Sequence, residues 1–382
     1  MKITDIKIYA AEYAQTSKSP TNKKWVFLKM ETDEGIHGWG EVGSSVNVSE
    51  NFMATAIREV SPQLIGENPM DIDRLWNKLF RMFSYMGSRG FTTSLTAGFD
   101  IALWDIKGKL SGLPVYDLLG GRYRDPVRLY CNAWFNGCYT PEEYANAAKI
   151  NVLENGHTAC KLDPFLEMTQ YHTMYQDGFI SEEGEQLGYD IVAAVRDTVG
   201  PEIEILIDAH GHYNVPNAVR ISNNLYERFN IAWFEEPVPP EGINALKQVK
   251  QNTKAPICVG ERLYTRADFI PILEKNLADF IMPDTIWTGG ISEIKKIATM
   301  AEAYYIPVAP HVIPGGPLEL IAAAHVMSSV PNFYKLEHSH AFIPEHNNLL
   351  KEPYLIKDGH IHLNNKPGLG FELDESKLEE IV

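Results

Sequence analysis

The chain has 382 residues, of which 45% are hydrophobic and 22% are charged, a balance that excludes a disordered protein. Its 34 Lys and Arg against 50 Asp and Glu give a formal charge of −16, which argues against nucleic acid as the main partner because phosphate binding needs a basic face. An anionic small molecule is not excluded, since a bound cation can reverse the local field. The length favours two or three structural units, or one barrel with an attached domain.

The four cysteines contain no C-x-x-C pair; they are Cys131, Cys138, Cys160 and Cys258. Such cysteines are typical of reduced core thiols in a cytoplasmic protein, although an irregular disulfide stays open. The N-terminus alternates apolar and polar residues as a strand does, and no apolar run of 18 residues occurs, so neither a secretory signal nor a membrane span is expected. We therefore expect a soluble cytoplasmic protein, and we expect it to form a homo-oligomer.

The first part of the chain begins with strands and continues with helices. Strands are predicted at 2–12, 24–31 and 36–42, the last two as a hairpin that turns at 33–35. Helical periodicity begins near residue 50, and 92–111 is predicted to be a largely apolar helix. This order predicts an α+β domain over 1–125.

From about residue 127, short apolar runs alternate with helix-like stretches. Eight runs are present, and they begin at Val127, Ala159, Ile203, Ala232, Ile257, Phe280, Val308 and Phe333. Alternation of this kind predicts an α/β fold, a (β/α)₈ barrel of the TIM type over 126–350, with an open doubly wound sheet as the alternative. The tail, 351–382, returns to strand and turn residues and is predicted to pack back on the N-terminal domain and complete it.

Polar residues follow most of these apolar runs. They are Lys161 and Asp163, Asp208 and His210, Glu235, Glu261, Asp284, His311 and Glu337. From Asp208 to Glu337 the steps are 27, 26, 23, 27 and 26 residues, each about one βα unit. Side chains with this spacing would converge on the C-terminal mouth of a barrel, where barrel enzymes carry their active sites.

Three carboxylates in this set follow consecutive strands: Asp208, Glu235 and Glu261. Neighbouring carboxylates repel each other unless a cation lies between them, and oxygen ligands without a thiolate suit Mg²⁺. The alternative is three separate salt bridges to Lys and Arg.

Asp208 and His210 lie two apart on a strand and so face the same side. Asp284 would orient the ring of His311 on the next strand, so that His311 can act as a proton acceptor.

Two other patterns carry less weight. Residues 38–43 match G-x-G-x-x-G, but they lie on the second arm of a hairpin and open no clear amphipathic helix, so the pattern is poor evidence for dinucleotide binding. There are three H-x-H pairs, which begin at His210, His338 and His360. None has a nearby cysteine or a spaced third histidine in the sequence that would argue for zinc.

Four segments together resemble the enolase superfamily, namely 208–216, 233–240, 260–266 and 283–293. Their sequences are Asp-Ala-His-Gly-His-Tyr-Asn-Val-Pro, Trp-Phe-Glu-Glu-Pro-Val-Pro-Pro, Gly-Glu-Arg-Leu-Tyr-Thr-Arg and Pro-Asp-Thr-Ile-Trp-Thr-Gly-Gly-Ile-Ser-Glu. More narrowly, they resemble its mandelate racemase branch and, within it, acid-sugar dehydratases of the galactonate dehydratase type. The resemblance covers nearly the whole chain.

The resemblance implies a function and a set of roles. Asp208, Glu235 and Glu261 match the Mg²⁺ ligands of the family. Asp284 and His311 match the dyad that removes the α-proton of a carboxylate substrate, giving an enediolate that loses its 3-hydroxyl to become a 2-keto-3-deoxy acid. The expected activity is therefore that of a Mg²⁺-dependent hydro-lyase acting on a sugar acid, an aldonate.

The resemblance also assigns the remaining polar residues. His210 matches the general acid that assists departure of the hydroxyl, and Glu337 matches a strand-eight carboxylate near the substrate. Lys161 is followed by Leu162 and Asp163, so the Lys-x-Lys pair of the racemases is absent. The absence of this pair argues against racemisation and leaves His311 as the single base. Lys161 is then expected to neutralise the charge of the substrate carboxylate.

Two segments leave the substrate open. The loop 312–317 after His311 differs from that of the dehydratases, and 165–187 is long and rich in Tyr, Met and Glu. A cycloisomerase of an anhydro-sugar acid, using the same enolate, is therefore an alternative. A barrel that only binds acid sugars is a second one.

The polar, basic segment 15–25 is either a solvated loop or a mobile cover over the barrel mouth.

Overall fold

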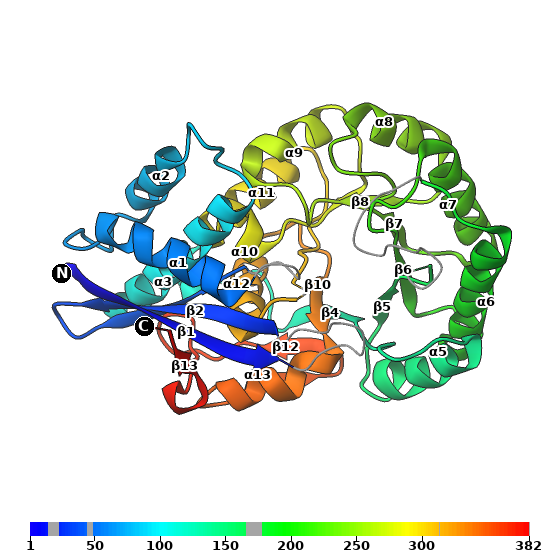
Figure 1. The fold of residues 1–382 in the computed structure, drawn as a ribbon. Coiled ribbons are helices and arrows are strands. Elements are labelled where there is room, and N and C mark those ends of the chain that lie inside the picture. Colours follow the sequence, from blue (N-terminus) through cyan, green and yellow to red (C-terminus); the bar gives the residue numbers. More distant parts are fainter. Residues whose placement is uncertain (14–22, 44–48, 166–177, 313, 382) are drawn as a thin grey trace.

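The computed structural model describes the chain except for residues 14–22, 44–48, 166–177, 313 and 382. Most of segment 15–25, for which a loop or a cover was expected, and the larger part of 165–187 lie outside the described residues. Figure 1 shows a small sheet with helices beside a ring of strands that is surrounded by helices. Among the described residues, no helix has the length and apolar character needed to cross a membrane.

The N-terminal part is an antiparallel sheet covered by helices. Its strands are β1 (Ile3–Tyr13), β2 (Lys23–Thr32), β3 (His37–Val42) and, from the tail, β13 (Glu379–Glu380), in the order β13-β1-β2-β3. The helices are α1 (Glu50–Val60), α2 (Ile72–Met82), α3 (Phe91–Ser111) and the short α4 (Val115–Leu118). Buried residues of β1 to β3 and of α1 to α3 form one apolar core, so each predicted strand and helix of this part is confirmed.

The glycines of the G-x-G-x-x-G pattern serve the packing of β3 on α3. A Cβ atom on Gly40 would overlap the carbonyl oxygen of Gly98, and one on Gly38 would overlap that of Ala102. The backbones of the strand and the helix are therefore in direct contact, which only glycine permits on the strand. The first two glycines of the pattern are thus explained by helix packing.

The second part is a closed parallel barrel. Its strands are β4 (Val127–Asn132), β5 (Ala159–Leu162), β6 (Glu204–Asp208), β7 (Trp233–Glu235), β8 (Ile257–Val259), β9 (Phe280–Ile281) and β10 (Leu336–Ser339). Between β9 and β10, Val308 bridges Ile281 on one side and Phe333 on the other. Because β10 pairs in parallel with β4, the ring closes with eight strand positions, which confirms the barrel over the open sheet.

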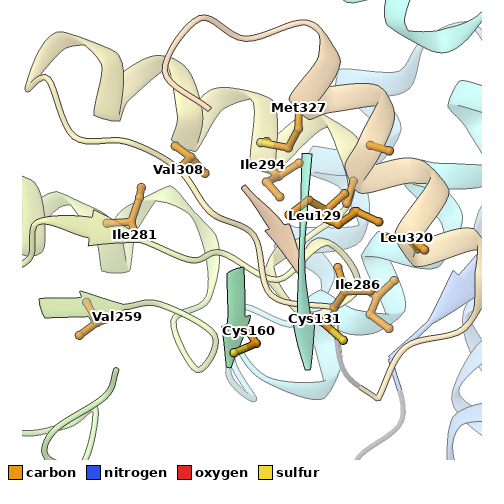
Figure 2. Packing of buried hydrophobic residues seen from close by; sticks show 14 of the residues in the cluster. Leu129, Cys131, Cys160, Val259, Ile281, Ile286, Ile294, Val308, Leu320 and Met327 are labelled. Atoms are coloured by element: carbon orange, nitrogen blue, oxygen red, sulfur yellow. The ribbon is translucent and has the colours of Figure 1, made fainter. Parts of the chain in front are cut away.

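Helices surround this ring (Figure 1). They are α5 (Pro141–Ala147), α6 (Glu182–Val199), α7 (Val215–Phe229), α8 (Ile243–Asn252), α9 (Thr265–Glu274), α10 (Thr285–Thr288), α11 (Ile291–Ala303), α12 (Pro317–Ser328) and α13 (Ile343–Leu349). Their buried faces and the outward faces of the strands, together with residues of β1 to β3 and of the tail, form the largest apolar core, part of which is drawn in Figure 2. A separate small core, with no more than one residue from each strand position, fills the inside of the barrel: Tyr130, Ala159, Leu206, Trp233, Cys258, Met282 and Ala309.

The tail contacts both parts. Strands β11 (Leu355–Lys357) and β12 (His360–His362) form a hairpin, and β12 pairs antiparallel with β4 of the barrel. Further along, β13 pairs with β1, so the tail completes the N-terminal sheet as predicted. The pairing of the tail with the barrel was not predicted. The domain limits 1–125, 126–350 and 351–382 stay predictions.

The contact between β3 and α3 gives a test of the fold. Gly40→Ala places a methyl group against a backbone carbonyl that cannot move away, and we expect it to lower the free energy of unfolding by roughly 2–3 kcal/mol. Gly35→Ala is the control, because Gly35 has a positive φ of 77° but no atom of the described residues lies within 4 Å of the added Cβ. Its expected cost is only about 1 kcal/mol of backbone strain. If urea denaturation shows that the two variants lose the same free energy of unfolding, the explanation of Gly40 by the contact with α3 is wrong.

Candidate active site

Most polar residues of the barrel mouth lie on the inward-facing side of the strands, just beyond the inner core. Six of them lie two residues beyond a residue of the barrel's inner core, and a strand places residues i and i+2 on the same side. The pairs of inner-core residue and site residue are Tyr130 and Asn132, Ala159 and Lys161, Leu206 and Asp208, Trp233 and Glu235, Met282 and Asp284, and Ala309 and His311. The fold therefore brings side chains from separate strands to one end of the barrel, as predicted.

The three predicted ligand carboxylates lie together. Asp208 and Glu235 end β6 and β7 and are register partners in the parallel ladder, and Glu261 follows β8 by two residues. One oxygen of each lies within 4.8 Å of the others, and all three side chains are buried. Burial and the repulsion of Asp208 raise the pKa of Glu235 well above its usual value. Such a cluster of buried oxygen donors fits a hard divalent cation.

Lys161 provides a positive charge within this cluster. Its side chain is 1% exposed, and its Nζ lies 2.6 Å from Glu235, 2.9 Å from Glu337 and 3.4 Å from Asp208. Burial opposes the charged ammonium, but the surrounding carboxylates raise its pKa well above the usual value. Because one ammonium faces several carboxylates, the site retains an excess of negative charge that a bound cation can balance.

The Asp284–His311 dyad lies beside the carboxylates. His311 Nδ1 is 2.7 Å from Asp284 Oδ2, while its Nε2 faces Glu261 Oε2 at 3.3 Å. The indole of Trp287 lies 5.1 Å from the imidazole, ring centre to ring centre. Burial disfavours the imidazolium, but Glu337, Glu261 and Asp284 raise the pKa of His311 to about 9. Asp284 thus fixes the ring and leaves Nε2 directed at the centre of the site.

His210 approaches from a different strand end. Its Nδ1 lies 2.8 Å from Asp163 Oδ2 and its Nε2 lies 3.3 Å from Asp208 Oδ2, and the side chain is 38% exposed. Burial disfavours its charged form, but Asp208 and the hydrogen bond to Asp163 raise its pKa to about 10. The backbone of His210 has φ = 45°, a left-handed conformation, and its N–H donates to Asp208 Oδ1. This strained turn directs the imidazole over the carboxylates.

Glu337 is held on the last strand by two donors. The amide of Asn132 on β4 donates to Glu337 Oε1 at 2.8 Å, and the backbone N–H of Val312 donates to Oε2 at 2.9 Å. Lys161 contacts the same carboxylate, and together with His311 these groups keep the Glu337 pKa below its usual value although burial opposes this. Glu337 therefore lies ionised between the dyad and the lysine.

Sequence reasoning missed several partners of these residues. Asp163 follows its strand but was given no role, and it holds His210. Asn132 ends the first strand, and an asparagine there gives no signal of its contact with Glu337. Glu319 lies in the first turn of the apolar helix α12, where a lone acid among Leu, Ile and Ala is the available signal.

Glu319 is an unusual buried acid. Among the described residues neither of its carboxyl oxygens has a hydrogen-bond partner of good geometry, and Asp284 and Glu41 are nearby. Burial, Asp284 and Glu41 raise its pKa well above the usual value. Glu41, the acid of the G-x-G-x-x-G pattern, accepts from the backbone N–H groups of Gly316 and Glu319 and so connects β3 with the start of α12. The raised pKa disfavours a further negative charge beside the dyad.

Comparison with known proteins identifies the family of the chain. Residues 6–120 match the model of the mandelate racemase/muconate lactonizing enzyme N-terminal domain, and residues 143–377 match the enolase C-terminal domain-like model. The chain therefore belongs to the mandelate racemase/muconate lactonizing enzyme family of the enolase superfamily, which confirms the resemblance found in the sequence.

Several curated relatives are similar over most of their length. A D-xylonate dehydratase of Haloferax volcanii is 35% identical, covering 96% of this chain and 87% of its own, and a D-galactonate dehydratase of Pectobacterium atrosepticum is 36% identical, covering 100% and 94%. Among solved structures, a mandelate racemase/muconate lactonizing enzyme-like protein from Rubrobacter xylanophilus has a TM-score of 0.88 at 36% identity, covering 98% and 96%. An enolase superfamily member from Salmonella Typhimurium has a TM-score of 0.89 at 33% identity, covering 100% and 99%.

The position of Lys161 predicts an electrostatic effect that does not depend on turnover. Lys161→Met removes the ammonium from among three carboxylates, so we expect the metal-free protein to lose about 3–5 kcal/mol of stability. The same change makes the site more negative, so Mg²⁺ should raise the midpoint of thermal unfolding more than it does in the unchanged protein.

Lys335→Met is the matched control. Lys335 is equally buried and pairs with Glu204, at the beginning of β6 and away from the barrel mouth. Its removal should destabilise the protein without altering the Mg²⁺-induced shift. An unchanged shift in Lys161→Met would count against a cation site at these carboxylates.

Proposed function

We propose that this protein is a Mg²⁺-dependent dehydratase of a sugar acid. The observation that carries the proposal is the pair of imidazoles, each held by its own carboxylate, on different strand ends around one buried carboxylate cluster. Such an arrangement supplies a base and an acid to one bound molecule. The names of the relatives, which include xylonate, galactonate and gluconate dehydratases, support an aldonate as the substrate.

The residues present fit a resident Mg²⁺. Asp208, Glu235 and Glu261 would hold it, because they are three buried oxygen donors and carry more negative charge than Lys161 balances. Bound there, Mg²⁺ supplies positive charge that stabilises the extra negative charge a substrate carboxylate gains when the adjacent carbon loses its proton. Lys161 contributes charge of the same sign next to it.

His311 takes the C2 proton in this proposal. Asp284 accepts from Nδ1, so Nε2 carries the lone pair that faces the substrate. The imidazole must be neutral to act, and its pKa is raised by Glu337 and Glu261. Engagement of Glu261 as a ligand reduces the negative charge that faces His311, which lowers that pKa toward the range where a base functions at neutral pH. Glu337, fixed by Asn132, would lie next to the substrate.

His210 completes the reaction as the general acid. With Nδ1 hydrogen bonded to Asp163, Nε2 gives its proton to the 3-hydroxyl, the C3–O bond breaks, and water leaves. The electron pair of the enediolate forms the C2–C3 double bond, and the enol product tautomerises to the 2-keto-3-deoxy acid. The protons balance, because His311 takes one from C2 and His210 gives one to the departing 3-hydroxyl.

A library of C4 to C6 acid sugars tests the activity. We expect one or a few members to raise the thermal unfolding midpoint in the presence of Mg²⁺ and to yield a 2-keto-3-deoxy acid. A cyclised isomer without release of water would favour the cycloisomerase, and binding without any product across the library would favour the binding barrel. Either outcome overturns the dehydratase.

Metal removal is the next test. Chelation should abolish turnover of the identified acid, and Mg²⁺ or Mn²⁺ should restore it, because the negative charge formed at the substrate carboxylate then has a counter-charge. Glu235→Gln should weaken Mg²⁺ binding by removing one charge from the site. Full activity in protein shown by elemental analysis to be metal-free is incompatible with the proposal.

Proton exchange separates the base from the acid. His311→Asn should lose both dehydration and exchange of the C2 proton with deuterated solvent, whereas His210→Asn should lose dehydration by about 10² to 10⁴ in rate and keep the exchange. The reason is that the enediolate still forms without His210 but cannot expel hydroxide. Asp284→Asn should resemble a weakened form of the His311 change. The roles must be reversed if His210→Asn abolishes exchange and His311→Asn retains it.

A further inference from the structure

A second cluster of metal-ligating groups lies on the outer side of the barrel. Cys131 of β4, His157 before β5, and His340 after β10 bring their sulfur and nitrogen atoms within 4.8 Å of one another. In the sequence no cysteine or third histidine is near the pair formed by His338 and His340. The fold supplies both, because the first and last strands of the barrel meet when it closes.

Strand alternation separates this cluster from the barrel mouth. Asn132 and Glu337 are directed inward, where they hydrogen bond to each other. Their neighbours Cys131 and His338 therefore face outward, since adjacent residues of a strand point to opposite sides. Figure 2 shows Cys131 and Cys160 on adjacent strands within the outer apolar core. The two candidate sites are thus on opposite faces of the same strands.

The histidines of the cluster have few partners. His157 is 2% exposed and His338 is 1% exposed, and their rings stack with centres 4.8 Å apart. Their Nε2 atoms are 3.3 Å apart, and the Nδ1 atoms of His157, His338 and His340 have no hydrogen-bond partner among the described residues. Buried polar atoms in proteins are nearly always paired, so a cluster of unpaired imidazole nitrogens beside a thiol points to a ligand.

The types of donor atom indicate which ion this cluster would bind. One cysteine sulfur and two imidazole nitrogens are the donors that Zn²⁺ and similar transition metals prefer, whereas Mg²⁺ prefers oxygen. We propose that Cys131, His157 and His340 bind a divalent transition metal ion of the zinc class, with His338 positioning His157 by stacking. His340 is only partly buried.

Such an ion would act as a clasp on the barrel. Its ligands come from the first strand, from the turn that precedes the second, and from the end of the last strand, which is the seam where β10 and β4 pair. Binding to the folded but not to the unfolded chain stabilises the fold. The expected consequence is greater resistance to unfolding, independent of the chemistry in the barrel mouth.

Cobalt gives a specific readout of this site. Untagged full-length protein is reduced, treated with chelator and titrated with Co²⁺, and we expect a thiolate-to-cobalt charge-transfer band that saturates at one equivalent and is displaced by Zn²⁺. Oxygen ligands give no such band, so it should persist in Asp208→Asn. Zn²⁺ should also raise the thermal unfolding midpoint of Asp208→Asn.

Variants decide whether the named residues are the ligands. Cys131→Ser should abolish the band, and His340→Asn should weaken Co²⁺ binding by roughly tenfold or more. Cys160→Ser is the matched control, a buried cysteine in register with Cys131 that is not part of the cluster. If Cys131→Ser fails to fold, the partly exposed His340→Asn decides alone. An absent band, or a band lost in Cys160→Ser and kept in His340→Asn, overturns the proposal.

Discussion

The structure depends on one concentration of buried charge. Asp208, Glu235, Glu261 and Glu337 are withdrawn from water at the carboxyl ends of the strands, with Lys161 as the ammonium among them. Removing such groups from water costs several kcal/mol per ion unless opposite charges and hydrogen bonds compensate. The surrounding contacts can be understood as that compensation, and the excess negative charge that remains is what makes a divalent cation a natural occupant.

The rest of the fold keeps these groups in place. Parallel pairing puts the ends of β6 and β7 in register, so Asp208 and Glu235 lie side by side at the mouth. On the other side, Glu41 of β3 accepts from backbone N–H groups of Gly316 and Glu319, so the N-terminal sheet fixes the helix that lies beside the dyad. The close contact of Gly40 with α3 holds that strand at the required distance. The small domain is therefore part of the site's framework.

Local periodicity in the sequence was enough to predict the barrel and most of its mouth. The eight apolar runs indicated the strand positions, and the charged residues after them indicated the members of the mouth, because parallel strands all end on one side of a barrel. Contacts between strands that are distant in the chain, such as Asn132 with Glu337, could not be predicted in this way, and neither could the holding of His210 by Asp163. The buried acid Glu319 was missed because its burial and its raised pKa depend on packing that no local pattern encodes.

The closing seam of the barrel shows why such contacts matter. Strands β4 and β10 pair in parallel, with Glu337 opposite Tyr130 and His338 opposite Cys131, so successive residues of each strand alternate between the mouth and the outer core. A shift of β10 by one residue would exchange its two faces and place the imidazole of His338 where the carboxylate of Glu337 belongs. The hydrogen bond from Asn132 to Glu337 inside and the Cys131, His157 and His340 cluster outside both require the same register. A clasp on the outer face would therefore hold Glu337 in place as well, linking the stability of the closed barrel to the geometry of its mouth.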